Sequence, residues 1–236
     1  MRIDENRSLS DGEIRTLSFV EIFEPLTEDE LAKIDWRKLS TKVRAGETFY
    51  TPLDLCETLF ILLKGRVRVF RKSALGKEFT LNVFGDGTVF GEMALTAQSF
   101  RNSYAQALED SEIAAMCRAD VERLILDKPA VGLQLVHLLS ERIVQYERRL
   151  EDIGLKEVPA RLAGILLLLL ESDGIRDREA YKLIGRYTHY QLATMIGANR
   201  EAVTRAFRVL REAGALEIDR RTIQIKDLDA LREIAA

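Results

Sequence analysis

The hydrophobic pattern of this chain changes its period near residue 120, and this change limits the folds that the chain can adopt. Between about Thr48 and Met116, apolar and polar residues alternate, as in the segments FILLKGRVRVF and FTLNVF. This period of two predicts strands that bury one face in a core. Glycines interrupt the alternation at turn-like intervals, at positions 46, 65, 76, 85, 87 and 91. Several short strands joined by glycine turns predict an antiparallel sandwich or barrel.

Beyond residue 120 the apolar residues follow a helical period. Between Asp120 and Gly154 they recur three and four residues apart, at Val136, Leu139, Ile143, Tyr146, Leu150 and Ile153. This spacing is the a/d seam of a coiled coil, although the seam is shorter than the three or four heptads that identify one by themselves. We predict a helix that pairs with the same helix of a second copy. A single amphipathic helix that lies on its own domain is the alternative.

Length and composition set further limits. The chain has 236 residues, of which 47% are hydrophobic and 31% charged, as in soluble proteins with one large or two modest domains. The apolar run Ile165–Leu170 is much shorter than the roughly 20 residues of a membrane-spanning helix. The N-terminus has no apolar signal segment, and the two cysteines, Cys56 and Cys117, fit a reducing compartment. We therefore expect a cytoplasmic protein with no membrane partner.

Two further segments are helical by pattern. Residues 11–36 contain core candidates at Phe19, Ile22, Phe23 and Leu31. Gly154 ends the long helix, and Lys156–Pro159 is the predicted hinge into a second domain. That domain opens with a buried helix over Ala160–Glu171, which a polar stretch follows.

The last part of the chain has the pattern of two short helices joined by a tight turn. Thr188 and Gln191 form a T-x-x-Q capping box at the start of THYQLATMIG. Gly197 ends that helix, and Asn199 is the predicted N-cap of the next one, NREAVTRAFRVLREAG. The short turn between them is typical of a helix-turn-helix. The segment ALEIDRRTIQIKDL then predicts two short strands, which would form a wing.

The second of these helices carries charges on the face that packing does not need. Val203, Phe207 and Leu210 supply its buried side. The residues that fall away from that side, near the N-terminal end, are Arg200, Glu201, Thr204 and Arg205. Recognition helices read bases with such residues, because Arg donates two bonds to guanine and Glu accepts from cytosine. An ordinary surface pair between Glu201 and Arg205 is the alternative.

Charge is distributed unevenly along the chain. From Val158 to the end, 13 Lys and Arg residues against 11 Asp and Glu residues give a net charge of +2, and the rest carries −5. A mildly basic C-terminal part is compatible with a polyanion such as double-stranded DNA. The competing class is a ligand-binding or enzymatic module whose helix-turn-helix contacts protein.

The segment Arg200-Glu201-Ala202-Val203-Thr204-Arg205 resembles the recognition helix of the bacterial CRP/FNR regulators, in their cyclic-AMP receptor protein branch. The resemblance covers nearly the whole chain. It implies an α+β fold: an antiparallel β-roll like the cyclic-nucleotide-binding jelly roll (1–119), a dimerisation helix (120–155) and a winged helix-turn-helix (156–236). It also implies a homodimer on inverted TGTGA-type half-sites, with Thr188, Asn199, Arg200, Glu201, Thr204 and Arg205 at the DNA and RNA polymerase as a partner.

The segment VFGEMALTAQSFRNSYAQAL resembles the phosphate-binding cassette of the same family. The resemblance implies that Glu92, after Gly91, holds a ribose hydroxyl and that Arg101 binds a phosphate. Asn102 stands where the family has Ser, and Ser103 follows it. On the long helix, Tyr146 and Glu147 fall where the family binds adenine.

These departures leave three alternatives open. The effector is cyclic AMP or a related cyclic nucleotide, it is another small molecule, or the regulator acts without one. In the third case the pocket is vestigial, and Glu92 and Arg101 form a buried pair. No cofactor is required in any of them.

No catalytic or metal site is predicted. Two histidines, His137 and His189, are too few for an all-protein zinc site, and two cysteines are too few for an iron–sulfur cluster. The carboxylates are scattered, with no nucleophile, base and carboxylate set. Cys56 is either a redox switch or a small semi-buried residue. His137 is interpreted as a partly exposed helix residue, with a haem ligand as the less favoured alternative. The chain is not expected to be an enzyme.

Overall fold

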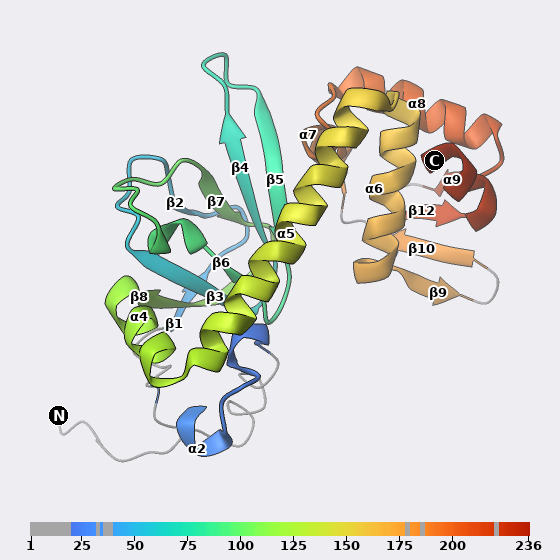
Figure 1. Cartoon of the computed structure of the whole chain (residues 1–236). Coiled ribbons are helices and arrows are strands. Elements are labelled where there is room, and N and C mark those ends of the chain that lie inside the picture. Colours follow the sequence, from blue (N-terminus) through green and yellow to red (C-terminus); the bar gives the residue numbers. More distant parts are fainter. Residues whose placement is uncertain (1–19, 32–33, 35–39, 178–179, 185–186, 220–221) are drawn as a thin grey trace. The chain divides into compact units, whose positions relative to one another are not determined.

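The computed structural model describes residues 20–31, 34, 40–177, 180–184, 187–219 and 222–236 (Figure 1). The chain divides into two compact units. The first comprises the described residues up to Lys77 together with Leu81–Ile143, and the second comprises Glu78–Thr80 and Val144–Ala236. The three-part division at residues 119 and 155 stays a prediction.

Two four-stranded antiparallel sheets build the first unit (Figure 1). Their strand orders are β1-β8-β3-β6 and β2-β7-β4-β5. The strands are β1 (Ser40–Val43), β2 (Thr48–Tyr50), β3 (Thr58–Lys64), β4 (Val67–Lys72), β5 (Glu78–Phe84), β6 (Val89–Phe90), β7 (Tyr104–Ala107) and β8 (Ser111–Cys117). The predicted antiparallel double sheet is confirmed.

Strand β3 is buried on both faces, as its unbroken apolar run LFILL suggests. On one face Leu62 joins the apolar cluster between the two sheets, which includes Val67, Val69, Phe90 and Ala105. On the other face Leu59 and Ile61 join a second cluster, which includes Phe23, Leu31, Leu135 and Leu138. Full burial of a leucine or isoleucine side chain contributes roughly 1.5–3 kcal/mol. β3 therefore connects the two hydrophobic cores of this unit.

The continuous N-terminal helix expected over residues 11–36 is wrong for its described part. That part holds one turn of 3-10 helix, η1 (Glu21–Phe23), and one turn of α-helix, α2 (Glu28–Leu31). Pro25 lies between them and disfavours helical backbone at the residue before it. The expected core residues Ile22, Phe23 and Leu31 are buried. Phe19 lies outside the described residues.

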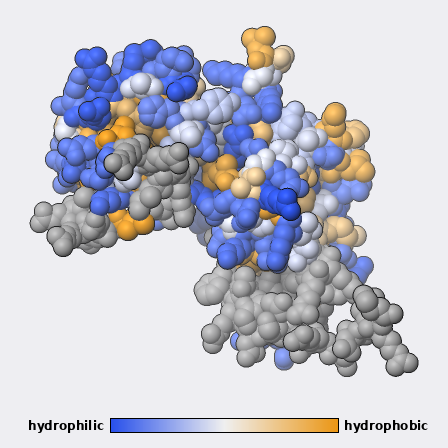
Figure 2. Space-filling view, turned by 180° about the vertical axis from the view of Figure 1, so that it is seen from behind, coloured by the Kyte–Doolittle hydropathy of each residue, from blue (hydrophilic) through white to orange (hydrophobic). Residues whose placement is uncertain are grey.

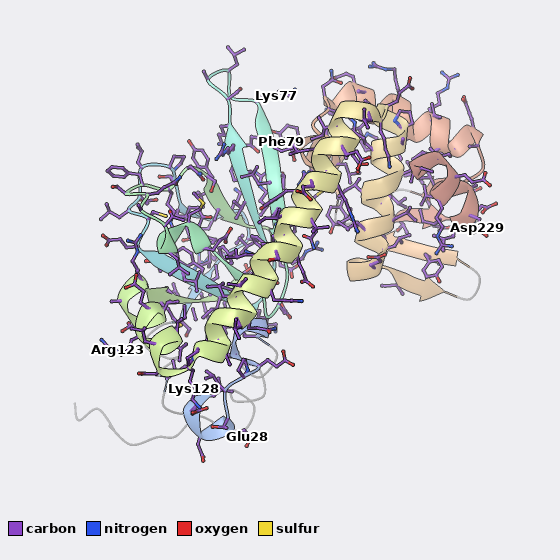
Figure 3. All side chains as sticks on the ribbon, in the orientation of Figure 1. Glu28, Lys77, Phe79, Arg123, Lys128 and Asp229 are labelled. Atoms are coloured by element: carbon purple, nitrogen blue, oxygen red, sulfur yellow. The ribbon has the colours of Figure 1, made fainter. Side chains whose placement is uncertain are left out.

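The helical pattern after residue 120 also forms two helices instead of one. These are α4 (Arg118–Asp127) and α5 (Pro129–Leu155). Pro129 causes the break, because it lacks the N–H that a continuing helix needs but suits the first position of a new one. Lys128, labelled in Figure 3, lies between the two helices and forms an ion pair with Glu30 of α2. The helix that carries the predicted seam therefore begins at Pro129.

The second unit contains helices and one small sheet. The helices are α6 (Val158–Asp173), α7 (His189–Ile196), α8 (Arg200–Glu212) and α9 (Leu228–Ala235), and the strands are β9 (Ile175–Asp177), β10 (Ala180–Ile184), β11 (Leu216–Asp219) and β12 (Thr222–Ile225). The sheet order is β11-β12-β10-β9. The predicted wing is thus β11 and β12, whereas β9 and β10 replace the expected polar connection.

Helix α6 is the core of this unit. It packs against α7, α8 and α9, and its Leu162, Ala163 and Leu166 are fully buried. From α8, Val203, Phe207 and Leu210 are buried as predicted. The apolar run that is too short to cross a membrane therefore forms the interior of the C-terminal unit.

Three residues of β5 belong to this second unit. Thr80, 1% exposed, places its hydroxyl 2.9 Å from the hydroxyl of Thr194 in α7. Arg149 donates to Thr80 O at 2.6 Å and also to Met195 O, and its guanidinium lies 5.0 Å from the ring of Phe79 (Figure 3). Residues far apart in the sequence thus complete the packing around α7.

Candidate nucleic-acid interface and effector site

Both helices of the helix-turn-helix are capped by the residues that the sequence indicated. Thr188 Oγ1 accepts from Gln191 N at 3.1 Å, and Gln191 Oε1 accepts from Thr188 N at 2.8 Å. Gly197 ends α7 with a left-handed backbone, at a φ of 66°. Asn199 Oδ1 then accepts from Ala202 N at 2.7 Å and caps α8. The caps satisfy backbone N–H groups and fix where α8 begins.

The start of α8 presents three charged side chains to solvent. Arg200, Glu201 and Arg205 are exposed, while Val203 and Phe207 on the same helix are buried. Within the described part of the chain, none of the three forms an ion pair or side-chain hydrogen bond. The alternative pair between Glu201 and Arg205 is therefore not formed. Further along α8, Arg208 and Glu212 do form such a pair at 2.7 Å.

Thr204 differs from these charged neighbours, because its hydroxyl is already bonded. The Oγ1 atom donates to Arg200 O at 3.0 Å and lies 2.9 Å from Nδ1 of His189 in α7. The His189 ring stacks on Phe207 with a centroid distance of 4.8 Å. Burial and the charge of Arg200 lower the pKa of His189 below its ordinary value. Sequence reasoning missed His189, because it treated the residue only as a poor zinc ligand.

A hollow of about 370 Å³ lies between the start of α6 and the side of α8. Pro159 and Arg161 line it from α6, and Arg205 and Val209 line it from α8. Arg161 Nε is buried without a hydrogen-bond partner in the described part of the chain. Arg205 is thus exposed at the start of α8 and also lines this hollow.

In the first unit, Gly91 adopts a conformation that few other residues could. It has a φ of 80° and immediately precedes the 3-10 helix η2 (Glu92–Leu95). A Cβ atom at this position would lie 2.9 Å from the Phe60 ring and 3.0 Å from Nη1 of Arg101. Glycine is therefore required both by the backbone and by the close approach of Arg101.

Arg101 is 5% exposed, and its guanidinium is held by carbonyl groups and aromatic rings. It donates to Gly91 O at 3.2 Å and to Thr58 O. Its carbon Cζ lies 4.7 Å from the Tyr50 ring centroid and 5.0 Å from that of Phe60. This arrangement fixes the guanidinium and leaves some of its five donors for an anion.

The residues next to Arg101 have different environments. Asn102 is exposed, whereas Ser103 is 7% exposed and hydrogen-bonds to Tyr50. Burial raises the pKa of Tyr50 to about 12, and the bond from Ser103 partly offsets this. Ser103 is therefore already engaged, and Asn102 is free to face solvent.

Glu92 is bound by a residue that sequence reasoning did not assign to the pocket. Arg142 of α5 donates to Glu92 Oε2 at 3.0 Å and also to Val89 O, and its Cζ lies 4.8 Å from the Phe84 ring centroid. Arg142 is 7% exposed. The expected alternative, a buried pair of Glu92 with Arg101, is wrong, because the partner of Glu92 is Arg142. The other two predicted effector residues, Tyr146 and Glu147, belong to the second unit and stay a prediction.

The predicted seam on α5 is largely exposed in the single chain. The exposed fractions are 61% for Val136, 58% for Ile143 and 69% for Leu150, while Tyr146 and Ile153 are each 38% exposed. Leu139 is partly buried against the core of the first unit. A row of large apolar side chains on one exposed helix face commonly marks an interaction surface.

Comparison with known proteins agrees with both halves of this arrangement. Residues 40–128 match the family described as cyclic nucleotide-binding domain, and residues 160–234 match the Crp-like helix-turn-helix domain. The chain is 33% identical to the Cyclic AMP receptor protein of Thermus thermophilus over 80% of this chain and 85% of that protein. The chain belongs to the CRP/FNR family of transcription regulators.

Other CRP/FNR members are similar over most of their length. The CRP-like cAMP-activated global transcriptional regulator of Mycobacterium tuberculosis is 25% identical over 89% of this chain and 94% of that protein. The crystal structure of a CRP/FNR transcriptional regulator from Thermus thermophilus superposes with a TM-score of 0.68 at 27% identity, covering 83% of this chain and 97% of that one. The similarity to this family thus extends over both units, with the DNA-binding domain in the second.

Further observations concern metal binding, membrane-spanning helices, the two cysteines and His137. In the described ranges no group of three His, Cys, Asp or Glu side chains is arranged to hold a metal ion. No helix described here is both long and apolar enough to cross a bilayer, and the face shown in Figure 2 is mostly hydrophilic over its described residues. Cys56 is fully buried, Cys117 is exposed, and His137 is an exposed residue beside Glu141.

Proposed function

We propose that this CRP/FNR regulator binds inverted-repeat DNA as a homodimer, with α8 reading TGTGA-type half-sites. The observation that carries this proposal is the exposed, unpaired set of Arg200, Glu201 and Arg205 at the capped start of α8. In this setting Arg200 and Arg205 donate to guanine O6 and N7, and Glu201 accepts from cytosine N4. Each well-made contact discriminates by ~1–3 kcal/mol. Thr188 and Asn199 shape the helix ends that approach the DNA backbone.

Pairing of two copies through α5 is consistent with the exposed apolar side chains of that helix and with an inverted-repeat DNA site. The exposed Val136, Ile143 and Leu150 would be covered by the same residues of a second α5. A two-fold dimer places two recognition helices on successive turns of the duplex, ~34 Å apart, which explains why an inverted repeat is the expected site. Contact with RNA polymerase and a cytoplasmic location are part of the same proposal.

We further propose that a cyclic nucleotide, cyclic AMP in the first instance, acts through the site around Glu92 and Arg101. The residues fit such a ligand: Glu92 can accept a ribose hydroxyl, and Arg101 keeps donors for a phosphate while its guanidinium is already oriented. The ion pair between Glu92 and Arg142 adds a direct link from this site to α5. A ligand that alters the pair would bias the helix that carries the dimer seam.

A second candidate, a regulator that needs no effector, rests on the same ion pair. Arg142 neutralises Glu92, and Arg101 is already hydrogen-bonded to two carbonyl groups. Glu92 therefore has a counterion and Arg101 has hydrogen-bond acceptors with no ligand in the pocket. Under this alternative, Glu92, Arg101 and Arg142 hold the first unit together and have no ligand role.

One titration separates these proposals. Purified protein is added to a labelled TGTGA/TCACA palindrome and to a scrambled duplex, at fixed salt and with or without cyclic AMP, while fluorescence anisotropy is measured. Specific binding only with cyclic AMP supports the nucleotide site. Specific binding in both conditions supports the effector-independent candidate. Equal affinity for the two duplexes contradicts the assignment of the half-site to α8.

A further inference from the structure

His189 makes two contacts with α8 through one imidazole ring. Its Nδ1 lies 2.9 Å from the Thr204 hydroxyl, and the ring plane stacks on Phe207 at 25°. The ring belongs to the first residue of α7, directly after the capping residue Thr188. We propose that His189 is a positioning residue for the DNA-reading helix α8 and that its imidazole ring takes up a proton when the protein binds DNA. This inference rests on the proposed function.

The hydrogen atoms in this contact can be assigned from the partners. The Thr204 hydroxyl has one hydrogen, and Arg200 O, which can only accept, lies 3.0 Å from it. The hydroxyl therefore donates to Arg200 O and accepts from Nδ1–H of His189. The neutral ring then carries its lone pair on Nε2, and protonation adds a hydrogen there without breaking the bond to Thr204. The ring can thus become positively charged and keep its hydrogen bond to Thr204 of α8.

This contact acts on the part of α8 that would read bases. Thr204 is bonded to the carbonyl of Arg200, and Phe207 lies one turn further along the same helix. Contacts on two successive turns restrict rotation of α8 about its axis relative to α7. The directions of the Arg200 and Glu201 side chains depend on that rotation, and binding side chains must be held closely to be effective.

The charges near the ring oppose protonation in the free protein. Arg200 of α8 is the charged group that acts on the ring, while the other contacts from α8, Thr204 and Phe207, are uncharged. The start of α7 adds the positive end of a helix dipole. Burial and Arg200 lower the pKa of His189, so the ring is neutral at neutral pH.

Bound DNA would instead favour protonation of the His189 ring. Phosphate groups of the duplex that approach the start of α7, where His189 follows Thr188, supply negative charge beside the ring and raise its pKa above the value in the free protein. Specific affinity should therefore increase as pH falls through the interval between the bound and the free pKa. The increase is about tenfold for each pKa unit that separates the two states.

The test measures specific affinity from about pH 5.5 to about pH 8 at constant salt, a range chosen around the ordinary histidine pKa. His189→Gln keeps an N–H group for Thr204 but cannot titrate, so its pH profile should be flat. His137→Gln removes the other histidine, which is exposed and contacts Glu141. That matched control should keep the slope of the unmodified protein. An unchanged slope in His189→Gln would overturn the proton linkage.

Substitutions of Thr204 test the positioning role of His189 separately from its protonation. Thr204→Val should reduce specific affinity several-fold and leave binding to scrambled DNA unchanged, and Thr204→Ser, which restores the hydroxyl, should recover most of it. In a double-mutant cycle, the losses from His189→Ala and Thr204→Val should overlap. Losses that simply add, in variants with unchanged circular dichroism, would overturn the positioning role. Equal affinity of the unmodified protein for specific and scrambled DNA at every pH would instead overturn the proposed function.

Discussion

Nη1 of Arg142 lies 3.0 Å from Oε2 of Glu92, and this pair joins α5 to η2 inside the first unit. The Arg142 side chain is 8% exposed and the Glu92 side chain is 26% exposed. Two charges that are removed from water depend on each other, so loss of one leaves the other poorly solvated. The pair is therefore both a structural element and a direct connection from Glu92 to α5.

Arg142→Ala should destabilise the protein by about 2–4 kcal/mol, since the partly buried Glu92 carboxylate would lose its counterion. Urea unfolding, followed by circular dichroism, measures the change. The matched control is Arg208→Ala, which breaks the exposed pair with Glu212 and should change the stability very little, because both side chains are solvated. Equal effects of the two substitutions would show that the Glu92 pair is energetically unimportant.

Gly91→Ala should destabilise more than the same substitution at Gly76. Both glycines have positive φ angles, 80° and 76°. A Cβ at Gly91 would meet Phe60 and Arg101, whereas a Cβ at Gly76 would have nothing within 4 Å. Backbone strain of about 1 kcal/mol is common to both variants, and the clash adds roughly 1–3 kcal/mol at Gly91. Thermal unfolding of the two variants compares them; a larger loss at Gly76 would contradict the close packing inferred for Arg101.

Arg200→Ala and Glu201→Ala should each reduce discrimination between the palindrome and scrambled DNA by ~1–3 kcal/mol. The reason is that each removes contacts to base edges and leaves the buried face of α8 intact. Competition binding at fixed salt measures the effect. Arg208→Ala lies on the same helix and removes the same charge as Arg200→Ala, so it should weaken binding to both duplexes alike. If Arg208→Ala reduced discrimination as much as Arg200→Ala, the assignment of readers to the start of α8 would be wrong.

Ile143→Glu should convert the proposed dimer into a monomer, because it places a charge in the centre of the exposed seam on α5. Analytical ultracentrifugation distinguishes the two states. Leu126→Glu is the control, since Leu126 is 81% exposed on α4 and lies outside the seam. A protein that stays dimeric after Ile143→Glu would require another dimer interface.

Alkaline pH should unfold the protein partly through Tyr50. Its folded pKa is about 12, above the ordinary value of 10, because burial disfavours the phenolate. Stability is therefore retained below pH 10 and falls by up to about 3 kcal/mol as pH rises from 10 to 12. Tyr50→Phe should remove this part of the pH dependence, as measured by urea unfolding at several pH values. An unchanged decline in Tyr50→Phe would assign the alkaline loss to other groups.

The sequence predicted those elements whose pattern is periodic and whose ends carry caps. Alternation identified the strands of the two sheets, and Thr188, Gly197 and Asn199 marked the ends of α7 and α8 within a residue. The missed break at Pro129 was visible in the sequence, but the helical period continues across it. Strands β9 and β10 were missed because they are short and mix polar with apolar residues. In the described residues, β9 pairs with β10, and β10 pairs with β12.

The site was less predictable than the fold, for a physical reason. Pattern analysis assigns charged helix residues to solvent, and nothing in the pattern distinguishes the buried Arg142 from its exposed neighbour Glu141. Its burial depends on Glu92 and Val89 O, which are about 50 residues away in sequence and become neighbours only in the folded unit. His189 was overlooked for a similar reason, since its partners Thr204 and Phe207 lie on the next helix.

The Thr80–Thr194 contact has a practical consequence for domain transplantation. A C-terminal fragment that starts at Val144 omits Glu78–Thr80, although these residues pack as part of the same unit. In such a fragment the Thr194 hydroxyl would lose its contact with the Thr80 hydroxyl. Arg149 would lose its acceptor Thr80 O and the Phe79 ring beside its guanidinium. A chimaera that joins this DNA-binding unit to another regulator therefore needs residues equivalent to Glu78–Thr80. The host protein can supply them, or they can be added as a short inserted segment.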